Sequence, residues 1–245
     1  MAFQVELTSA RAWSDEQMNA LFAQGFPAFI VGDQDVKQQI GRVRELFGEY
    51  NIMLADEQGE PAATGWGVPI SWSGEVPDLP ETFARVLERS LETYDASFVA
   101  DTFVICGAIV HPARKGRGVA QALIGALIDT AVTHSLPRVI APVRPTLKHL
   151  YPLQSVDAYA KWVRNDDLPW DPWLRLHVRM GGELIDLAKK AQTIIGTITQ
   201  WEEWSGMEFP ESGDYVIPDG MAPLHIDRSA NLGTYVEPNI WIRHR

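Results

Sequence analysis

A basic, glycine-rich turn offers the clearest chemistry in this sequence. It follows the apolar run 103–110, which is typical of a buried strand, and it precedes a segment in which apolar residues repeat every four positions from Val119. The first N–H groups of a helix have no partner within the helix and lie at the positive end of its dipole. Gly116 and Gly118 would let a ligand approach the backbone closely, and Lys115 adds positive charge. The pattern therefore predicts an anion site suited to phosphate.

The common nucleotide-binding motifs do not describe this turn. The dinucleotide fingerprint GxGxxG needs a third glycine, but Gln121 stands at that position. The P-loop pattern GxxxxGK[ST] is absent from the sequence. Both nucleotide interpretations are therefore disfavoured.

The turn and its surroundings resemble the signature of the GCN5-related N-acetyltransferase superfamily, [Q/R]-x-x-G-x-[G/A]. Here the signature reads Lys115-Gly116-Arg117-Gly118-Val119-Ala120, with Lys115 in place of the usual Gln or Arg. The preceding run Ala108-Ile109-Val110-His111-Pro112 resembles the end of the family's fourth strand. The resemblance covers residues 51–180 well, whereas the flanking segments fit the family only loosely.

This resemblance implies an acyl-coenzyme A site, with acetyl-CoA as the expected cofactor. The pyrophosphate would lie on the N–H groups of residues 116–120, and the pantetheine arm would run along residues 108–110 like an added strand. In the family a backbone N–H of the fourth strand commonly holds the oxyanion, which by position falls near Val110. The residues expected to bind the cofactor are Ala108, Ile109, Val110, Lys115, Gly116, Arg117, Gly118, Val119 and Ala120.

The resemblance also suggests a proton donor. Family members often carry a Tyr four residues before a Gly in a pattern like F-Y-x-x-x-G-F, and the matching stretch 176–182 places His177 at the Tyr position. A histidine can donate a proton near neutral pH, although a buried histidine with a structural hydrogen bond is an equal alternative. Tyr151 and Tyr159 are other candidates for the acid, and Asp101 or an ordered water for the base.

A long segment at residues 144–172 separates the strand after the glycine turn from the next helix, and it exceeds the length usual in the superfamily. Insertions of this kind often determine substrate choice. Arg144 and Lys148 could attract a carboxylate or phosphate of the acceptor, and Tyr151 is the third candidate acceptor-binding residue. The structural alternative is that both cations pair with acidic side chains of the protein. The tryptophans in and after this segment are expected mainly to pack it against the core.

Other catalytic chemistries find little support. The six histidines include no HExxH pair, and no metal site is expected. No GxSxG motif is present, and Cys106 lies within an apolar run, where a core role is more usual than a nucleophilic one.

The pattern of apolar residues and turns predicts an α/β (α+β) fold with a mixed sheet. The resemblance implies that this central sheet is mostly antiparallel and flanked by helices, with a long insertion before the fourth main helix. Residues 1–245 are expected to form one acyltransferase domain, with a motif core at 51–182, the insertion at about 144–172 and C-terminal strands within 183–245. We expect strands near residues 3–7, 51–55, 62–70, 103–110, 137–143, 193–201 and 235–243, and helices near residues 15–25, 36–48, 80–94, 119–131 and 173–180.

Composition limits the possible partners. The chain has 245 residues, of which 46% are hydrophobic, and its formal net charge is -11 at pH 7. Such an acidic surface disfavours nucleic acid as a partner. A single cysteine fits a reducing compartment, and neither a secretory leader nor a membrane-spanning run is evident, so a cytoplasmic location without membrane attachment is expected.

Together these observations predict an acetyl-CoA-dependent N-acyltransferase in which a small-molecule or peptide amine attacks the thioester directly in a ternary complex. The alternative is a non-catalytic module that senses acyl-CoA or serves interactions on the same fold. A longer acyl donor remains open, and a homodimer is possible because two-fold dimers are the commonest oligomers.

Overall fold

The computed structural model describes residues 3–22 and 25–245. Within these residues one sheet of nine strands runs in the order β1-β2-β3-β4-β5-β9-β8-β7, and β6 pairs with the other edge of β9. Among the described strands β4 and β5 alone pair in parallel, which confirms the mixed, mostly antiparallel sheet. The strands are β1 Gln4–Leu7, β2 Asn51–Ala55, β3 Pro61–Ile70, β4 Thr102–Val110, β5 Arg138–Val143, β6 Glu183–Gly196, β7 Gly213–Tyr215, β8 Leu224–Asp227 and β9 Leu232–Arg243.

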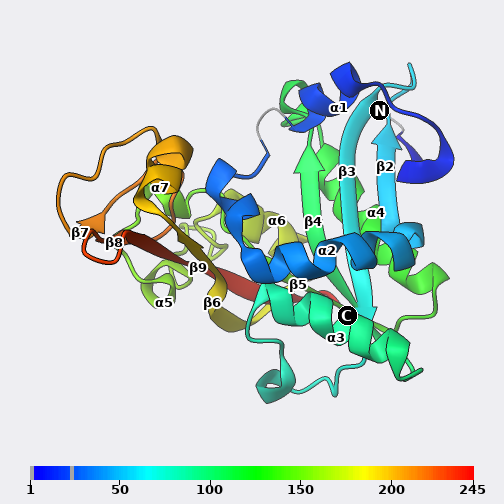
Figure 1. Ribbon diagram of the computed structural model, residues 1–245. Coiled ribbons are helices and arrows are strands. Elements are labelled where there is room, and N and C mark those ends of the chain that lie inside the picture. The colour runs from blue at the N-terminus through cyan, green and yellow to red at the C-terminus, as the bar shows by residue number, and fades with distance from the viewer. Residues whose placement is uncertain (1–2, 23–24) are drawn as a thin grey trace.

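Helices cover both faces of this sheet, with α2 and α3 on the near side and α4 on the far side of Figure 1. The ring of Trp66 on β3 meets Phe83 of α3, whereas a Cβ at the next-door position Gly65 would contact Leu127 of α4. Neighbouring residues of a strand point to opposite faces, so α3 and α4 lie on opposite sides. The α-helices are α1 Asp15–Phe22, α2 Gln34–Leu46, α3 Phe83–Asp95, α4 Val119–Thr133, α5 Val156–Tyr159, α6 Pro172–Arg179 and α7 Ile198–Ser205.

The buried apolar side chains form two clusters. The larger one lies between the sheet and helices α2, α3, α4 and α6. The smaller one joins the far end of β6 and β9 to β8, α7 and a short 3₁₀ turn, η2 (Ala28–Gly32). In it Phe29 of η2 packs edge-on against Tyr235 of β9, with ring centroids 5.0 Å apart. A segment from the first part of the chain therefore closes the C-terminal part of the sheet.

Strands β4 and β5 separate partway along their length. Their pairing covers Thr102 to Val104 on β4 and Arg138 to Ile140 on β5, and it ends there among the described residues. Strand β4 continues to Val110 paired only with β3, and β5 turns its other edge to β9. We call the space between the two strands beyond Val104 and Ile140 the β4–β5 wedge.

Several boundaries differ from the sequence predictions. The strand expected at 193–201 ends at Gly196, because Thr197 and Gln200 form a capping box that starts α7. Strand β6 begins earlier, at Glu183, and β7, β8 and α5 were not predicted. Helix α3 starts after the N-cap residue Thr82 rather than at Pro80. The expected helix end near Gly25 adjoins residues 23 and 24, which lie outside the described residues. No helix among the described residues is long and apolar enough to cross a membrane.

Candidate functional site

The glycine turn forms an uncapped helix N-terminus. Gly116 and Gly118 have φ angles of 79° and 76°, in the left-handed region that favours glycine. Gly118 is the N-cap residue of α4, and no side chain bonds to the cap. The first backbone bond of α4 runs from the Ala122 N–H to the Gly118 carbonyl, so the N–H groups of residues 119–121 have no helical partner. A Cβ at either glycine would meet no heavy atom within 4 Å among the described residues, so the space over the turn is open.

Basic side chains surround this turn in different ways. Arg114 is held by Asp56 in the β2–β3 hairpin, with a distance of 2.5 Å between Nη2 and Oδ2. Lys115 and Arg117 are exposed beside the turn. The structure thus brings together the predicted elements of an anion site: open glycines, uncapped N–H groups and positive charge.

The predicted pantetheine strand borders the β4–β5 wedge. Ala108, Ile109 and Val110 are half-buried, and β3 pairs with one edge of this segment. The edge toward β5 carries no strand pairing beyond Val104 in the described part of the chain. An extended ligand with amide groups could pair with this edge. Cys106 lies on the same strand, and burial raises the pKa of its thiol, which fits the predicted core role.

His177 is buried in α6, with 1% of its surface exposed. Its Nδ1 lies 2.8 Å from Nε2 of His244, and its ring packs edge-on against Trp173. Burial, together with His244, lowers the pKa of His177 to about 3, so the ring is neutral at pH 7. The His244 N–H donates to the carbonyl of Val139, which places the pair beside the paired part of β5. The proton-donor role stays a prediction, and the geometry favours the structural alternative.

Arg144 is the residue after β5, and it pairs with a carboxylate of β9. Its Nε donates to Oε1 of Glu237 at 2.8 Å, and its Nη2 donates to the carbonyl of Asp219 at 2.8 Å. Glu237 is 1% exposed and also accepts a hydrogen bond from the Tyr235 hydroxyl. For this residue the structure realises the alternative of pairing with an acidic side chain.

Lys148 is held differently, by two backbone carbonyls. Its Nζ donates to the carbonyl oxygens of Tyr151 at 2.8 Å and Met221 at 2.6 Å, and the residue is 1% exposed. Burial lowers the pKa of Lys148 to about 8. The ring of Tyr151 packs edge-on against Trp162, with centroids 4.9 Å apart. These contacts fix the insertion against the C-terminal part of the chain, and acceptor binding by Arg144, Lys148 and Tyr151 stays a prediction.

The other acid–base candidates also have structural partners. The Tyr159 hydroxyl donates to Oδ2 of Asp171, the residue that caps α6. Asp101 pairs with Arg138 at 2.9 Å, just before β4 begins, at the end of the strand opposite the glycine turn.

Sequence reasoning missed a group of buried polar residues on the α2 side of the sheet. Gln192 of β6 lies opposite Glu237 of β9, and Asn239 is two residues further along β9. Nε2 of Gln192 lies 3.4 Å from Oδ2 of Asp33, which caps α2. These residues are far apart in the sequence and match no motif, so only the sheet register could reveal them.

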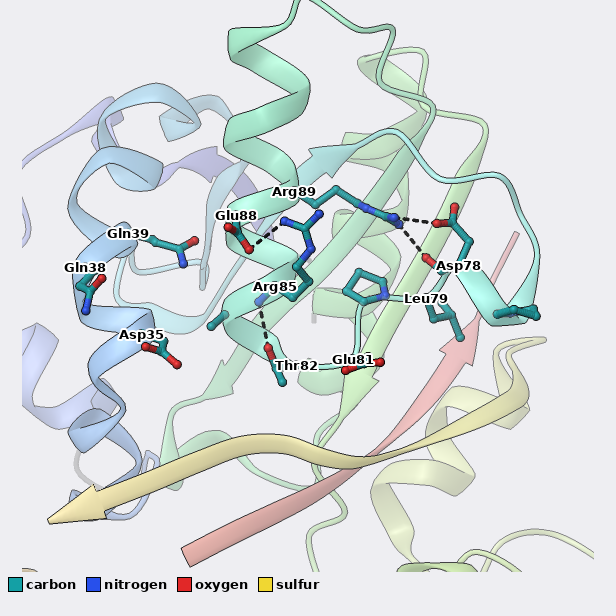
Figure 2. Close-up of a pocket in the computed structure, with 13 residues that line it drawn as sticks. Asp35, Gln38, Gln39, Asp78, Leu79, Glu81, Thr82, Arg85, Glu88 and Arg89 are labelled. Carbon is teal, nitrogen blue, oxygen red and sulfur yellow. Dashed lines mark hydrogen bonds and ion pairs between the residues drawn. The ribbon is translucent and has the colours of Figure 1, made fainter. Parts of the chain in front are cut away.

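A surface hollow of about 620 Å³ lies elsewhere, between α2 and α3 (Figure 2). Asp35, Gln38 and Gln39 reach it from α2, and Arg85 and Glu88 from α3. None of the predicted site residues lines it. No group of His, Cys, Asp and Glu that could hold a metal ion occurs among the described residues.

Comparisons with known proteins place this geometry in a family. The family model described as acetyltransferase (GNAT) family matches residues 16–153, more than half of the chain. An arginine N-acetyltransferase, AvaD, from Aspergillus versicolor is 28% identical over 225 residues, which cover 81% of this chain and 77% of that protein.

Solved structures share the fold at low sequence identity. The loading GNATL domain of CurA from Lyngbya majuscula superposes with a TM-score of 0.57 at 12% identity, covering 100% of this chain and 98% of that one. The GNAT-like decarboxylase GphF, solved in complex with isobutyryl-CoA, gives 0.55 at 12% identity, covering 94% and 93%. The chain therefore belongs to the acetyltransferase (GNAT) family, and the family together with the arginine N-acetyltransferase relative identifies it as an N-acetyltransferase.

Proposed function

We propose that this protein transfers an acetyl group from acetyl-CoA to a primary amine, and that arginine or a related basic amine is the acceptor. The uncapped, open N-terminus of α4 beside the unpaired edge of β4 carries this proposal. The relative that acts on arginine supports the acceptor class. The net charge of -11 favours the approach of a cationic molecule.

The residues present fit a coenzyme A thioester. The N–H groups of residues 119–121 would bind the diphosphate, and Gly116 and Gly118 leave the space that it needs. The edge of β4 at 108–110 would pair with the amides of the pantetheine arm. A backbone N–H near Val110 is the proposed donor to the carbonyl oxygen.

Bound acetyl-CoA supplies an activated acetyl group: the amine nitrogen forms a bond to the carbonyl carbon as the carbon–sulfur bond breaks, and the amine proton ends on the departing thiol. The protein must therefore orient the amine and exclude water. His177 is neutral at pH 7 because burial lowers its pKa to about 3, so we assign no proton donation to it.

The test is an amine panel with the purified protein and acetyl-CoA. Thiol release and the mass of the product are measured for arginine, ornithine, lysine, agmatine, an arylalkylamine and a peptide N-terminus, with an acceptor-free control for hydrolysis. We expect acetylated arginine or a close analogue with the highest kcat/KM. Acetylation confined to the arylalkylamine or the peptide N-terminus, neither of which needs a second basic group, would refute the acceptor class.

A second function stays in view because the predicted acid–base residues His177, Tyr159 and Asp101 are all engaged by other groups of the protein. A non-catalytic acyl-CoA sensor would bind acetyl-CoA and turn over no amine. Calorimetric titration with acetyl-CoA, made alongside the amine panel, separates the two functions.

A further inference from the structure

Asn239 of β9 has a buried oxygen without a partner. The residue is 6% exposed, and its Oδ1 makes no hydrogen bond among the described residues. Its Nδ2 donates to the carbonyl of Pro142 at 3.3 Å. This bond fixes the orientation of the amide, because a flipped amide would set two oxygens against each other. A buried polar oxygen left unpaired costs free energy, which a ligand N–H would recover.

The carbonyl of Pro142 faces the β4–β5 wedge. The Val139 N–H bonds to the Arg245 carbonyl, and the Val139 carbonyl accepts from the backbone N–H of His244, so Val139 turns both backbone groups toward the two residues that follow β9. Backbone groups alternate along a strand, so Pro142, three residues later, turns its carbonyl toward β4. Pairing with β4 has already ended at Ile140. The amide of Asn239 therefore reaches the open edge of β5.

Asn239 also lies on the face of the sheet opposite the glycine turn's helix. Tyr235, four residues earlier on β9, packs against Phe29 of η2, and alternate residues share a face. Ile242, of opposite parity, faces Gly182 next to α6. A thioester bound along β4 would thus enter the wedge from the α4 side, and Asn239 would approach it from the opposite face of the sheet.

The neighbouring polar side chains are already engaged. Glu237 binds Arg144, and Gln192 binds Asp33. We propose that Asn239 binds the acceptor: its Oδ1 accepts an N–H of the attacking nitrogen and holds the nitrogen's lone pair toward the thioester. This inference rests on the proposed function, since it assigns the residue that receives the amine.

The experiment compares the wild type with Asn239→Ala, Asn239→Thr and a control, Asn51→Ala, which truncates the same side chain at the start of β2. Steady-state KM and kcat are measured for arginine and for acetyl-CoA, and calorimetry measures arginine binding to the CoA-saturated protein. Circular dichroism and thermal unfolding establish that each variant is folded. The threonine variant suits a strand and keeps one side-chain oxygen, whose hydroxyl can donate to the Pro142 carbonyl and accept from a ligand, so it covers the case in which the alanine variant does not fold.

For Asn239→Ala we expect the KM and Kd for arginine to rise about fivefold to tenfold, because one buried hydrogen bond is lost. The KM for acetyl-CoA should stay unchanged. Asn239→Thr should show a smaller rise in both constants than Asn239→Ala, and Asn51→Ala should match the wild type. Equal KM values for arginine in the wild type and Asn239→Ala would overturn the inference, as would parallel losses for both substrates. A wild type that binds arginine through Asn239 without acetylating it would refute the proposed function and keep this inference.

Discussion

Replacing Gly118 by alanine tests the cofactor site directly, and Gly206→Ala is its matched control. Gly206 follows α7 with a φ angle of 67°, close to the 76° of Gly118. A Cβ would meet nothing within 4 Å at either position among the described residues. The two substitutions therefore impose the same kind of backbone strain without a clash, but only Gly118 borders the uncapped N–H groups of α4.

The strain is that of an L-residue in the left-handed region, about 1–2 kcal/mol at each position. Reduced flexibility of the unfolded chain offsets about 0.4–1 kcal/mol of it. Both variants should thus lose about 1 kcal/mol of the free energy of unfolding. At Gly118 the new methyl group would also keep the diphosphate from the N–H groups. Losing a hydrogen bond to a charged group costs about 1.5–3 kcal/mol, which raises the Kd for CoA roughly 10- to 100-fold.

Calorimetric titration with CoA and urea unfolding of both variants provide the measurements. We expect both variants to lose the same free energy of unfolding, and we expect the Kd for CoA to rise in Gly118→Ala alone. If Gly118→Ala binds CoA within twofold of the wild type, or if Gly206→Ala weakens binding as much, the diphosphate does not lie on this helix N-terminus.

Three further predictions concern buried titratable side chains. The pKa of His177 is about 3 in the folded protein, below the ordinary value of 6.5, so the unfolded chain binds more protons between these values and the protein loses stability as the pH falls through this window. At pH 5 the loss from His177 is about 2 kcal/mol, and urea unfolding at pH 5 and pH 7 should show a smaller loss in His177→Asn than in the wild type, because burial lowers the pKa of only His244 of this pair in the variant. The pKa of Lys148 is about 8, below the ordinary 10.5, so stability should rise by about 1 kcal/mol from pH 7 to pH 9, and an equal rise in Lys148→Met would contradict the assignment. Glu237→Ala leaves Arg144 without its carboxylate partner and should cost about 3–5 kcal/mol in urea unfolding; the double variant with Arg144→Met should recover part of this, and no recovery would argue against the pair.

The glycine turn could be predicted because its signals are local. An apolar strand, two glycines and a helical repeat follow one another within residues 103–133, and each signal depends on a few neighbouring residues. Helix α7 was not predicted, because the residues just before it favour a strand. Thr193 and Ile194–Ile195 favour a strand, and only the capping contact between Thr197 and Gln200 ends it.

The buried polar residues on the α2 side of the sheet could not be predicted, because they meet only through the sheet register. Arg144 and Glu237 are 93 positions apart, and neither residue type indicates its partner. The partnerless oxygen of Asn239 is likewise a property of the folded arrangement, since any asparagine in an extended segment has the same sequence signal. His177 shows the limit of transferring a role by position: its surroundings, rather than its place in a pattern, determine its protonation state.

Strand β9 has a consequence for how the chain acquires its shape during synthesis. It joins β5 and β8 along one edge and β6 along the other, and it follows all three in the sequence. Until it leaves the ribosome, each of these strands has an edge that no other strand pairs, and unpaired edges can associate with other chains. The nascent protein is therefore most vulnerable to aggregation just before residues 232–243 emerge, because three strands depend on this segment for pairing.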